Sequence, residues 1–331
     1  MIHGDLRPSP AVADPGRIAI IGAGHVGATT AYALMLRALF REIVLIDRDH
    51  ALAEAEAADI ADANALARPT RIWAGDYADA AGAGIAVITA GGVTHDSQSR
   101  LSVAAESAAI VSDCVNGLID AGFRGVLIVS ANPVDLMTLV AVRCSGLSPG
   151  QVIGTGALLD TSRLKQALSE ALDVSPASIE ALVLGEHGDS EVAAFSTVRI
   201  GGLTLEQFCA GSRALDTAAI ARQVRDAGYG IVRGKGYTSY GVATAIVRIC
   251  EAVIRDEKAV LPVTTLLTGQ YGLSGLCLSL PCVLAAGGVE RILAPGLDPD
   301  ETVALAASAQ VLRTAFAALS DPIAGRPSAP G

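Results

Sequence analysis

One short segment near the start of the chain constrains its fold more than any other feature. RIAIIGAG (residues 17–24) is a continuous apolar run that ends in glycines, which is typical of a strand buried on both faces of a parallel sheet. Further short apolar runs stand at 41–47, 71–75, 85–92 and 125–133. Helical patterns separate them, at 25–39, 57–66 and 101–120. Strands that alternate with helices predict an α/β chain with a doubly wound parallel sheet.

The pattern changes after about residue 150. Alternating residues in VAAFSTVRIGGLTL (192–205) and the glycine-broken stretch at 264–289 predict antiparallel strands. Helical patterns are expected at 159–168, 213–256 and 299–319. A chain of 331 residues is long for a single core, so we expect two domains. In chain order we predict a flexible segment at 1–16, a Rossmann domain at 17–152, an α+β catalytic domain for the substrate at 153–321 and a flexible tail at 322–331.

Charge and composition exclude several classes of function. The formal net charge of −10 disfavours nucleic acid and anionic membrane surfaces as partners, because both attract a positive face. The first residues lack the pattern of a signal peptide, and no uncharged apolar stretch reaches the ~20 residues that span a bilayer. The six cysteines lack metal-ligand spacing. We therefore expect a cytoplasmic protein with reduced cysteines and no metal.

The glycine turn after the first strand predicts a cofactor. In GAGHVG (22–27), Gly22 permits the tight turn, Gly24 lets the backbone approach a pyrophosphate, and Gly27 lets helix and strand pack closely. The helix that follows offers free N–H groups to the phosphates. Asp47 stands 20 residues past Gly27, where a carboxylate can hold the ribose hydroxyls of NAD and repel a 2′-phosphate. The alternative is a helix-capping Asp, and the neighbouring Arg48 weakens the exclusion of NADP.

A histidine between glycines and acids predicts proton transfer. His187, in GEHGDS (185–190), has an ordinary pKa near neutrality and can supply the proton that reduction of a carbonyl requires. Asp160 and Arg163, in LLDTSR (158–163), project from the same side of a helix. A buried Asp would orient the imidazole, and a guanidinium matches a substrate carboxylate. Singly, His187 could be an idle loop residue, and the helix pair a surface ion pair.

Five motifs, in order, resemble those of the L-lactate/L-malate dehydrogenases, a family that includes the L-2-hydroxyisocaproate dehydrogenases. They are GAGHVG, SANPVD (130–135), VIGTGALLDTSR (152–163), GEHGDS and GKGYTSYGVA (234–243), and the likeness covers about residues 17–320. The resemblance implies NAD as cofactor, a small 2-oxo or 2-hydroxy acid as substrate, and a homotetramer or homodimer.

The resemblance also implies a role for each of six residues. His187 is similar to the family's acid/base and Asp160 to its orienting partner, while Arg163 resembles the carboxylate clamp. The others are Arg100, which resembles a loop arginine that polarises the carbonyl, Asn132, which lies near both nicotinamide and substrate, and Thr238, which lines the substrate pocket. Their alternatives are a helix cap for Arg100, a turn for Asn132 and a buried helix position for Thr238.

The loop before Arg100 differs from the family at the position whose side chain determines substrate specificity. Lactate dehydrogenases typically carry Gln, and malate dehydrogenases Arg, where this chain has Thr94. Thr94 brings no charge and little bulk, so we expect a neutral 2-oxo acid, either pyruvate or a larger aliphatic one. His95 could compensate for the missing charge, which leaves malate dehydrogenase as an alternative. The other alternative is an NAD-binding scaffold without catalysis.

Overall fold

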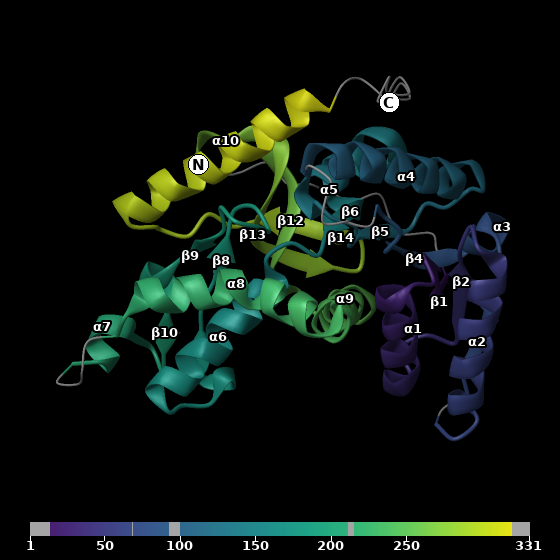
Figure 1. Ribbon diagram of the computed structural model, residues 1–331, viewed down its shortest axis with the longest axis horizontal. Helices are drawn as coiled ribbons and strands as arrows, with labels where there is room; N and C mark the ends of the chain where they lie inside the picture. The colour runs from purple at the N-terminus through teal and green to yellow at the C-terminus, as the bar shows by residue number, and fades with distance from the viewer. Residues whose placement is uncertain (1–13, 68, 93–99, 211–214, 320–331) are drawn as a thin grey trace.

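The parallel sheet has the strand order of a doubly wound fold. The computed structural model describes residues 14–67, 69–92, 100–210 and 215–319. Six strands lie parallel in the order β3-β2-β1-β4-β5-β6 (Figure 1). Their bounds are β1 (Asp14–Ile21), β2 (Glu42–Ile46), β3 (Arg71–Ala74), β4 (Ala83–Ile88), β5 (Val126–Val129) and β6 (Val152–Gly154). This order confirms the predicted Rossmann sheet, whose ligand crevice lies at the carboxyl ends of the strands.

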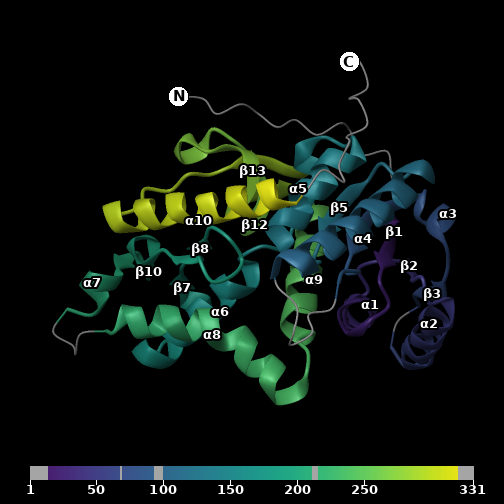
Figure 2. The ribbon, with the colours of Figure 1, turned by 45° about the horizontal axis from the view of Figure 1, so that its top comes forward.

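Helices cover both faces of this sheet. Helices α4 and α5 lie on one face, and α1, α2 and α9 (Tyr240–Ile254) lie on the other (Figures 1 and 2). The bounds in this half are α1 (His25–Arg37), α2 (His50–Asn64), α3 (Tyr77–Ala80), α4 (Arg100–Asp120) and α5 (Val134–Ser145). Helix α5 is an addition to the predicted elements. The residues of β5 are all buried between these layers, which explains the unbroken apolar run at this point of the sequence.

The antiparallel strands of the second half continue the first sheet. Strands β12 (Ala259–Thr268), β13 (Ser274–Ala285) and β14 (Gly288–Ile292) form the antiparallel sheet predicted near 264–289. Strand β12 also pairs with β6, with Thr264 opposite Gly154, so that one sheet of nine strands runs through both halves. The sequence predicts the antiparallel strands but not their continuity with the parallel sheet, because that continuity depends on the long-range pairing of β12 with β6.

The other helices of the second half are α6 (Leu158–Leu172), α7 (Leu205–Phe208), α8 (Thr217–Lys235), α9 (Tyr240–Ile254) and α10 (Pro299–Ala318). Helices α6, α7 and α8 contribute to a separate small core, whereas α9 and α10 pack against the main core of the large sheet. The short strands of this half are β7 (Ile179–Glu180), β8 (Val183–Leu184), β9 (Val192–Ala193), β10 (Arg199–Ile200) and β11 (Leu203–Thr204). The 3-10 turns lie at Pro149–Gln151, Pro176–Ser178, Phe195–Thr197 and Gln270–Gly272. Leu164 and Leu168 of α6 pack with Ile220 and Val224 of α8 in the small core.

The helical stretch predicted at 213–256 is two helices. Helix α8 ends at Lys235 because Gly236 caps it with a φ of +88°, a conformation that favours glycine. The chain then turns through Thr238 before α9 begins at Tyr240. Both helices pack against α6, so this turn lies beside the helix that carries Asp160 and Arg163.

Three global features bear on function. Among the residues described, no helix is long and apolar enough to cross a membrane. In the same ranges no group of His, Cys, Asp and Glu side chains is arranged to hold a metal ion. All six cysteines carry free thiols, and five of them are buried.

Candidate active site

Two glycines of the first turn are required by local packing. Strand β1 ends at Ile21, and Gly22 follows with a φ of +106°. A Cβ on Gly22 would lie 2.7 Å from the backbone nitrogen of Ala90, and one on Gly27 would lie 1.8 Å from the carbonyl oxygen of Gly22. Both distances are impossible for real atoms, so these glycines let β1, β4 and α1 meet closely.

The third glycine leaves space for a ligand. No described heavy atom lies within 4 Å of a Cβ built on Gly24, which is exposed. In the described part of the chain no side chain caps the first turn of α1, so its N–H groups remain available to an anion. At the end of β2, Asp47 accepts the Ala23 N–H through Oδ2 at 2.7 Å and the Asp49 N–H through Oδ1 at 2.9 Å. An open glycine, an uncapped helix and a carboxylate 20 residues beyond Gly27 fit a dinucleotide with free ribose hydroxyls.

The centre of the site is a carboxylate shared by two cationic side chains. Asp160 and Arg163 lie on the first turns of α6, and His187 lies in the loop between β8 and β9. His187 Nδ1 is 2.5 Å from Oδ2 of Asp160, and the Arg163 guanidinium donates to Oδ1 of the same carboxylate at 2.9 Å. The Asp160 side chain is 2% exposed, against 18% for Arg163 and 28% for His187. The three side chains thus form a cluster in which the carboxylate is buried and the two cationic groups reach solvent.

The hydrogen bond to Asp160 determines which nitrogen of the His187 imidazole is free and favours its protonated form. Because Asp160 binds Nδ1, the other ring nitrogen, Nε2, is left to exchange a proton with a ligand. Burial alone would lower the pKa of His187, but the hydrogen bond and charge of Asp160, with the charges of Asp135 and Glu191, raise it to about 9. At neutral pH the site therefore holds a protonated histidine beside an arginine, which suits the binding of an anion and the donation of a proton.

Two buried carboxylates near His187 did not emerge from the sequence. Asp135, in the first turn of α5, accepts the backbone N–H of His187 at 2.8 Å. Burial and the charge of Asp160 raise the pKa of Glu191. The charges of His187, Arg225 and Arg163 act in the opposite direction but do not cancel this rise. Asp135 belongs to the NPVD motif, and Glu191 directly follows GEHGDS. Both residues lie in or next to motifs that the sequence analysis named, but only the fold brings them close to His187.

Of the remaining predicted residues, Asn132 and Thr238 are described by the structure, whereas Thr94 and the side chain of Arg100 lie outside the described ranges. Asn132 is exposed just after β5, three residues before Asp135. Thr238 is half-buried between α8 and α9. Arg100 is the first residue of α4, but its side chain lies outside the described part. Thr94 lies outside the described residues altogether.

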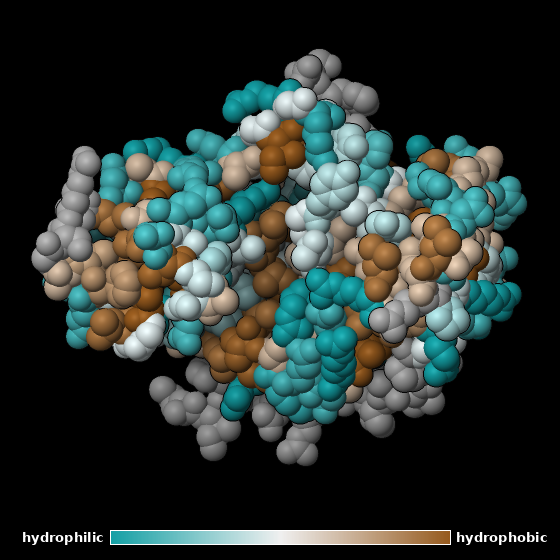
Figure 3. Space-filling view, turned by 90° about the horizontal axis from the view of Figure 1, so that it is seen from below, coloured by the Kyte–Doolittle hydropathy of each residue, from teal (hydrophilic) through white to brown (hydrophobic). Residues whose placement is uncertain are grey.

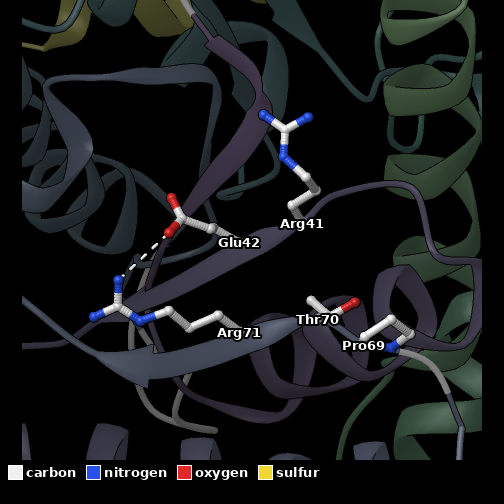
Figure 4. Close-up of a pocket in the computed structure, with 5 residues that line it drawn as sticks. All are labelled: Arg41, Glu42, Pro69, Thr70 and Arg71. Carbon is white, nitrogen blue, oxygen red and sulfur yellow. Dashed lines mark hydrogen bonds and ion pairs between the residues drawn. The ribbon is translucent and has the colours of Figure 1, made fainter.

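Surface shape alone does not identify this site. Seen from the side of α1 and α9, the molecule is hollowed near its middle, with hydrophobic residues around the hollow (Figure 3). A separate surface hollow of about 600 Å³ is lined by Arg41, Glu42, Pro69, Thr70 and Arg71 (Figure 4). It lies where β2 and β3 begin, the opposite end of β2 from Asp47, and Glu42 there already pairs with Arg71 at 3.4 Å. We assign no chemistry to it.

Comparison with known families matches nearly the whole chain. Residues 16–154 match the model of the lactate/malate dehydrogenase NAD-binding domain. Residues 157–320 match the model of the lactate/malate dehydrogenase alpha/beta C-terminal domain.

Named relatives are similar over the same length. The chain is 42% identical to an L-lactate dehydrogenase of Thermus aquaticus, covering 92% of this chain and 99% of the relative. It is 39% identical to an L-lactate dehydrogenase of Priestia megaterium, covering 90% and 94%. Among solved structures, the ligands-bound minor L-lactate dehydrogenase of Enterococcus mundtii superposes with a TM-score of 0.89 at 33% identity, over 91% of this chain and 97% of the other.

Proposed function

Because the chain belongs to the lactate/malate dehydrogenase family, we propose that it reversibly reduces a small neutral 2-oxo acid to the L-2-hydroxy acid with NADH. The observation that carries this proposal is the Asp160 carboxylate, which binds the His187 imidazole and the Arg163 guanidinium at once. That cluster combines a proton donor with an anion clamp. We assign cofactor binding to residues 17–152 and substrate binding to 153–321.

The residues at the carboxyl ends of the parallel strands would hold the cofactor. Gly24 and the first turn of α1 would receive the pyrophosphate, and Asp47 would bind the ribose hydroxyls. Asn132, exposed just after β5, would stand near the nicotinamide and the substrate carbonyl, as the family resemblance implies. Bound NADH supplies the hydride.

The substrate is held by its carboxylate and protonated at its carbonyl oxygen. Arg163 binds the carboxylate with the edge of its guanidinium that does not face Asp160. His187 then donates its Nε2 proton to the oxygen as negative charge develops there, and Asp160 stabilises the imidazolium. In the reverse direction neutral His187 accepts the proton. As the family resemblance implies, Arg100 polarises the carbonyl and Thr238 lines the substrate pocket.

The side chain at position 94 determines which 2-oxo acid the enzyme prefers. Thr94 offers neither the charge that would pair with a second carboxylate nor much bulk, which favours a neutral acid with a methyl or larger group. NADH oxidation with pyruvate, 2-oxobutyrate, 2-oxoisocaproate, phenylpyruvate and oxaloacetate tests this. We expect the highest kcat/KM with a neutral acid. A preference for oxaloacetate would make the protein a malate dehydrogenase, and NADH binding without turnover of any acid would make it a scaffold.

Compartment and assembly follow from the same proposal. Six free thiols are typical of a reducing compartment, which supports a cytoplasmic enzyme. The family supports a homotetramer or homodimer, and analytical ultracentrifugation distinguishes these from a monomer.

The pH dependence of the reaction reports on His187. Reduction requires the protonated imidazole, whose pKa is raised to about 9. We therefore expect kcat/KM for the 2-oxo acid to stay level through neutral pH and to fall as the pH passes about 9. In the oxidation direction, which requires the neutral imidazole, kcat/KM should rise with pH until the pH passes about 9. A pH–rate profile in both directions checks this, and a limb near the ordinary histidine pKa of about 6.5 would contradict it.

Cofactor choice should depend on the charge of Asp47. In Asp47→Asn the side-chain oxygen can still accept the Ala23 N–H, but the repulsion of a 2′-phosphate is lost. We expect the ratio of kcat/KM for NADH to that for NADPH to fall by about 10-fold or more. Asp49→Asn is the matched control, since the Asp49 carboxylate caps α2 by accepting the Leu52 N–H at 3.2 Å. An unchanged ratio in Asp47→Asn would show that Asp47 does not select the cofactor.

A further inference from the structure

The buried carboxylate of Asp135 is held by two donors from different parts of the fold. Asp135 is 2% exposed and lies in the first turn of α5. Its Oδ2 accepts the backbone N–H of His187 at 2.8 Å, and its Oδ1 accepts the hydroxyl of Thr264 at 2.5 Å. A buried charge is costly unless its lone pairs are used, and here each oxygen has a partner. The carboxylate thus fixes the main chain of the very residue that transfers the proton.

The contact continues to the helix that carries Asp160. The Thr264 hydroxyl lies 2.8 Å from that of Ser279, and the Ser279 oxygen accepts the N–H of Ala157 at 3.1 Å. Ala157 is the residue from which α6 begins. Thr264 and Ser279 face each other on the paired strands β12 and β13. One line of hydrogen bonds therefore connects the backbone of His187 to the start of α6.

From this geometry we infer that Asp135 is a positioning residue, which sets His187 in register with Asp160 and places a second negative charge against the imidazole. The inference rests on the proposed function, in which His187 donates the proton. It extends that function to a buried residue whose two carboxylate oxygens are bonded to the protein itself.

The charged groups around the imidazole come from several elements. Asp160 faces it from α6, Asp135 from α5 and Glu191 from the end of its own loop, while Glu186 faces Asp135. Arg163 and Arg225 face Glu191. Burial raises the pKa of Asp135 to about 6. The hydrogen bonds from the Thr264 hydroxyl and the His187 N–H, and the charge of His187, lower it but do not offset the burial. Asp135 is therefore ionised at neutral pH and above, where its charge favours the protonated imidazole.

The test is the substitution Asp135→Asn. The amide oxygen can accept the His187 N–H, and the amide nitrogen can donate to the Thr264 oxygen if the Thr264 hydroxyl turns to donate to Ser279, so that both contacts of residue 135 are kept and the charge is lost. We expect the pKa of His187 to fall by about one unit, because an opposite charge close to a titrating group is removed. The alkaline limb of the reduction profile should move down with it, while KM for the oxo acid stays within about twofold, since Arg163 is untouched.

The histidine pKa is measured directly by NMR with ¹⁵N-labelled imidazoles, using His187→Asn to assign the signal. Glu301→Gln is the matched control. Glu301 is also a buried carboxylate, and it accepts the Ser196 N–H at 2.9 Å from the first turn of α10, while it is not among the charges that act on the His187 pKa. It should lose stability without moving the pKa of His187. An unchanged His187 pKa and pH profile in a folded Asp135→Asn would overturn the inference.

Thr264→Val keeps the inference testable if Asp135→Asn does not fold. This change retains the charge and removes one of the two groups that hold the carboxylate. We expect kcat to fall by about 10-fold with KM for the oxo acid unchanged. A folded Thr264→Val with the wild-type kcat would contradict positioning through this line. Because the NMR titration requires no turnover, it tests Asp135 even if no 2-oxo acid proves to be a substrate.

Discussion

Replacing His187 with Asn is expected to lower kcat for reduction of the 2-oxo acid by about 1,000-fold, the loss typical of a general acid. The imidazole combines a raised pKa with a free Nε2, and no other described side chain bonded to Asp160 offers a proton that can be released near neutral pH. The binding of NADH, followed by its fluorescence, should be retained, because the glycine turn and Asp47 are unaffected.

A second histidine provides the control for this experiment. His50 also lies beside a carboxylate, with Nδ1 3.3 Å from Glu54, but both side chains are more than half exposed on α2. His50→Asn should leave kcat unchanged. If His187→Asn kept kcat within about 10-fold of the wild type while folded, another group would be the proton donor, and the assignment of His187 would fail.

The second large effect is expected at Arg163. In Arg163→Lys the charge is kept and the planar fork is lost, so that one ammonium must serve both Asp160 and the substrate carboxylate. We expect KM for the oxo acid to rise by about 100-fold, the equivalent of one or two charge-assisted hydrogen bonds. Because Arg163 also binds Asp160, kcat should fall too, but by less.

An arginine in a similar pair separates the role of Arg163 from general effects. Arg37 of α1 donates to Glu251 of α9 at 2.7 Å, away from the His187 cluster. Arg37→Lys should change neither KM nor kcat by more than about twofold. Steady-state kinetics with both variants decide the matter. An unchanged KM in Arg163→Lys would remove Arg163 as the carboxylate clamp.

Local patterns explain why the first half of the fold could be predicted. Strand β5 is buried on both faces and is therefore apolar throughout, and the apolar runs within β1 and β4 are explained in the same way. In the turn after β1, Gly27 is required by contact with Gly22, five residues away, although Gly22 itself is required by the distant Ala90. The spacing of Asp160 and Arg163 likewise placed them on one side of a helix before the structure located that helix.

Long-range pairing explains what could not be predicted. The pairing of Thr264 with Gly154, which joins the antiparallel strands to the parallel sheet, connects segments more than a hundred residues apart. The same strand brings Thr264 to Asp135, and no periodicity in NPVD reveals that contact. Glu191 also reads as an ordinary polar residue until the fold buries it beside Asp160 and His187. The groups that bear on the imidazole were therefore harder to find than the imidazole.

The most direct test of the account is to measure the product formed from pyruvate and NADH at neutral pH. We predict one L-lactate for each NADH consumed, and loss of this turnover in His187→Asn. Bound NADH with no product from pyruvate or from any larger 2-oxo acid would contradict the account, and the protein would then bind the dinucleotide without carrying out hydride transfer.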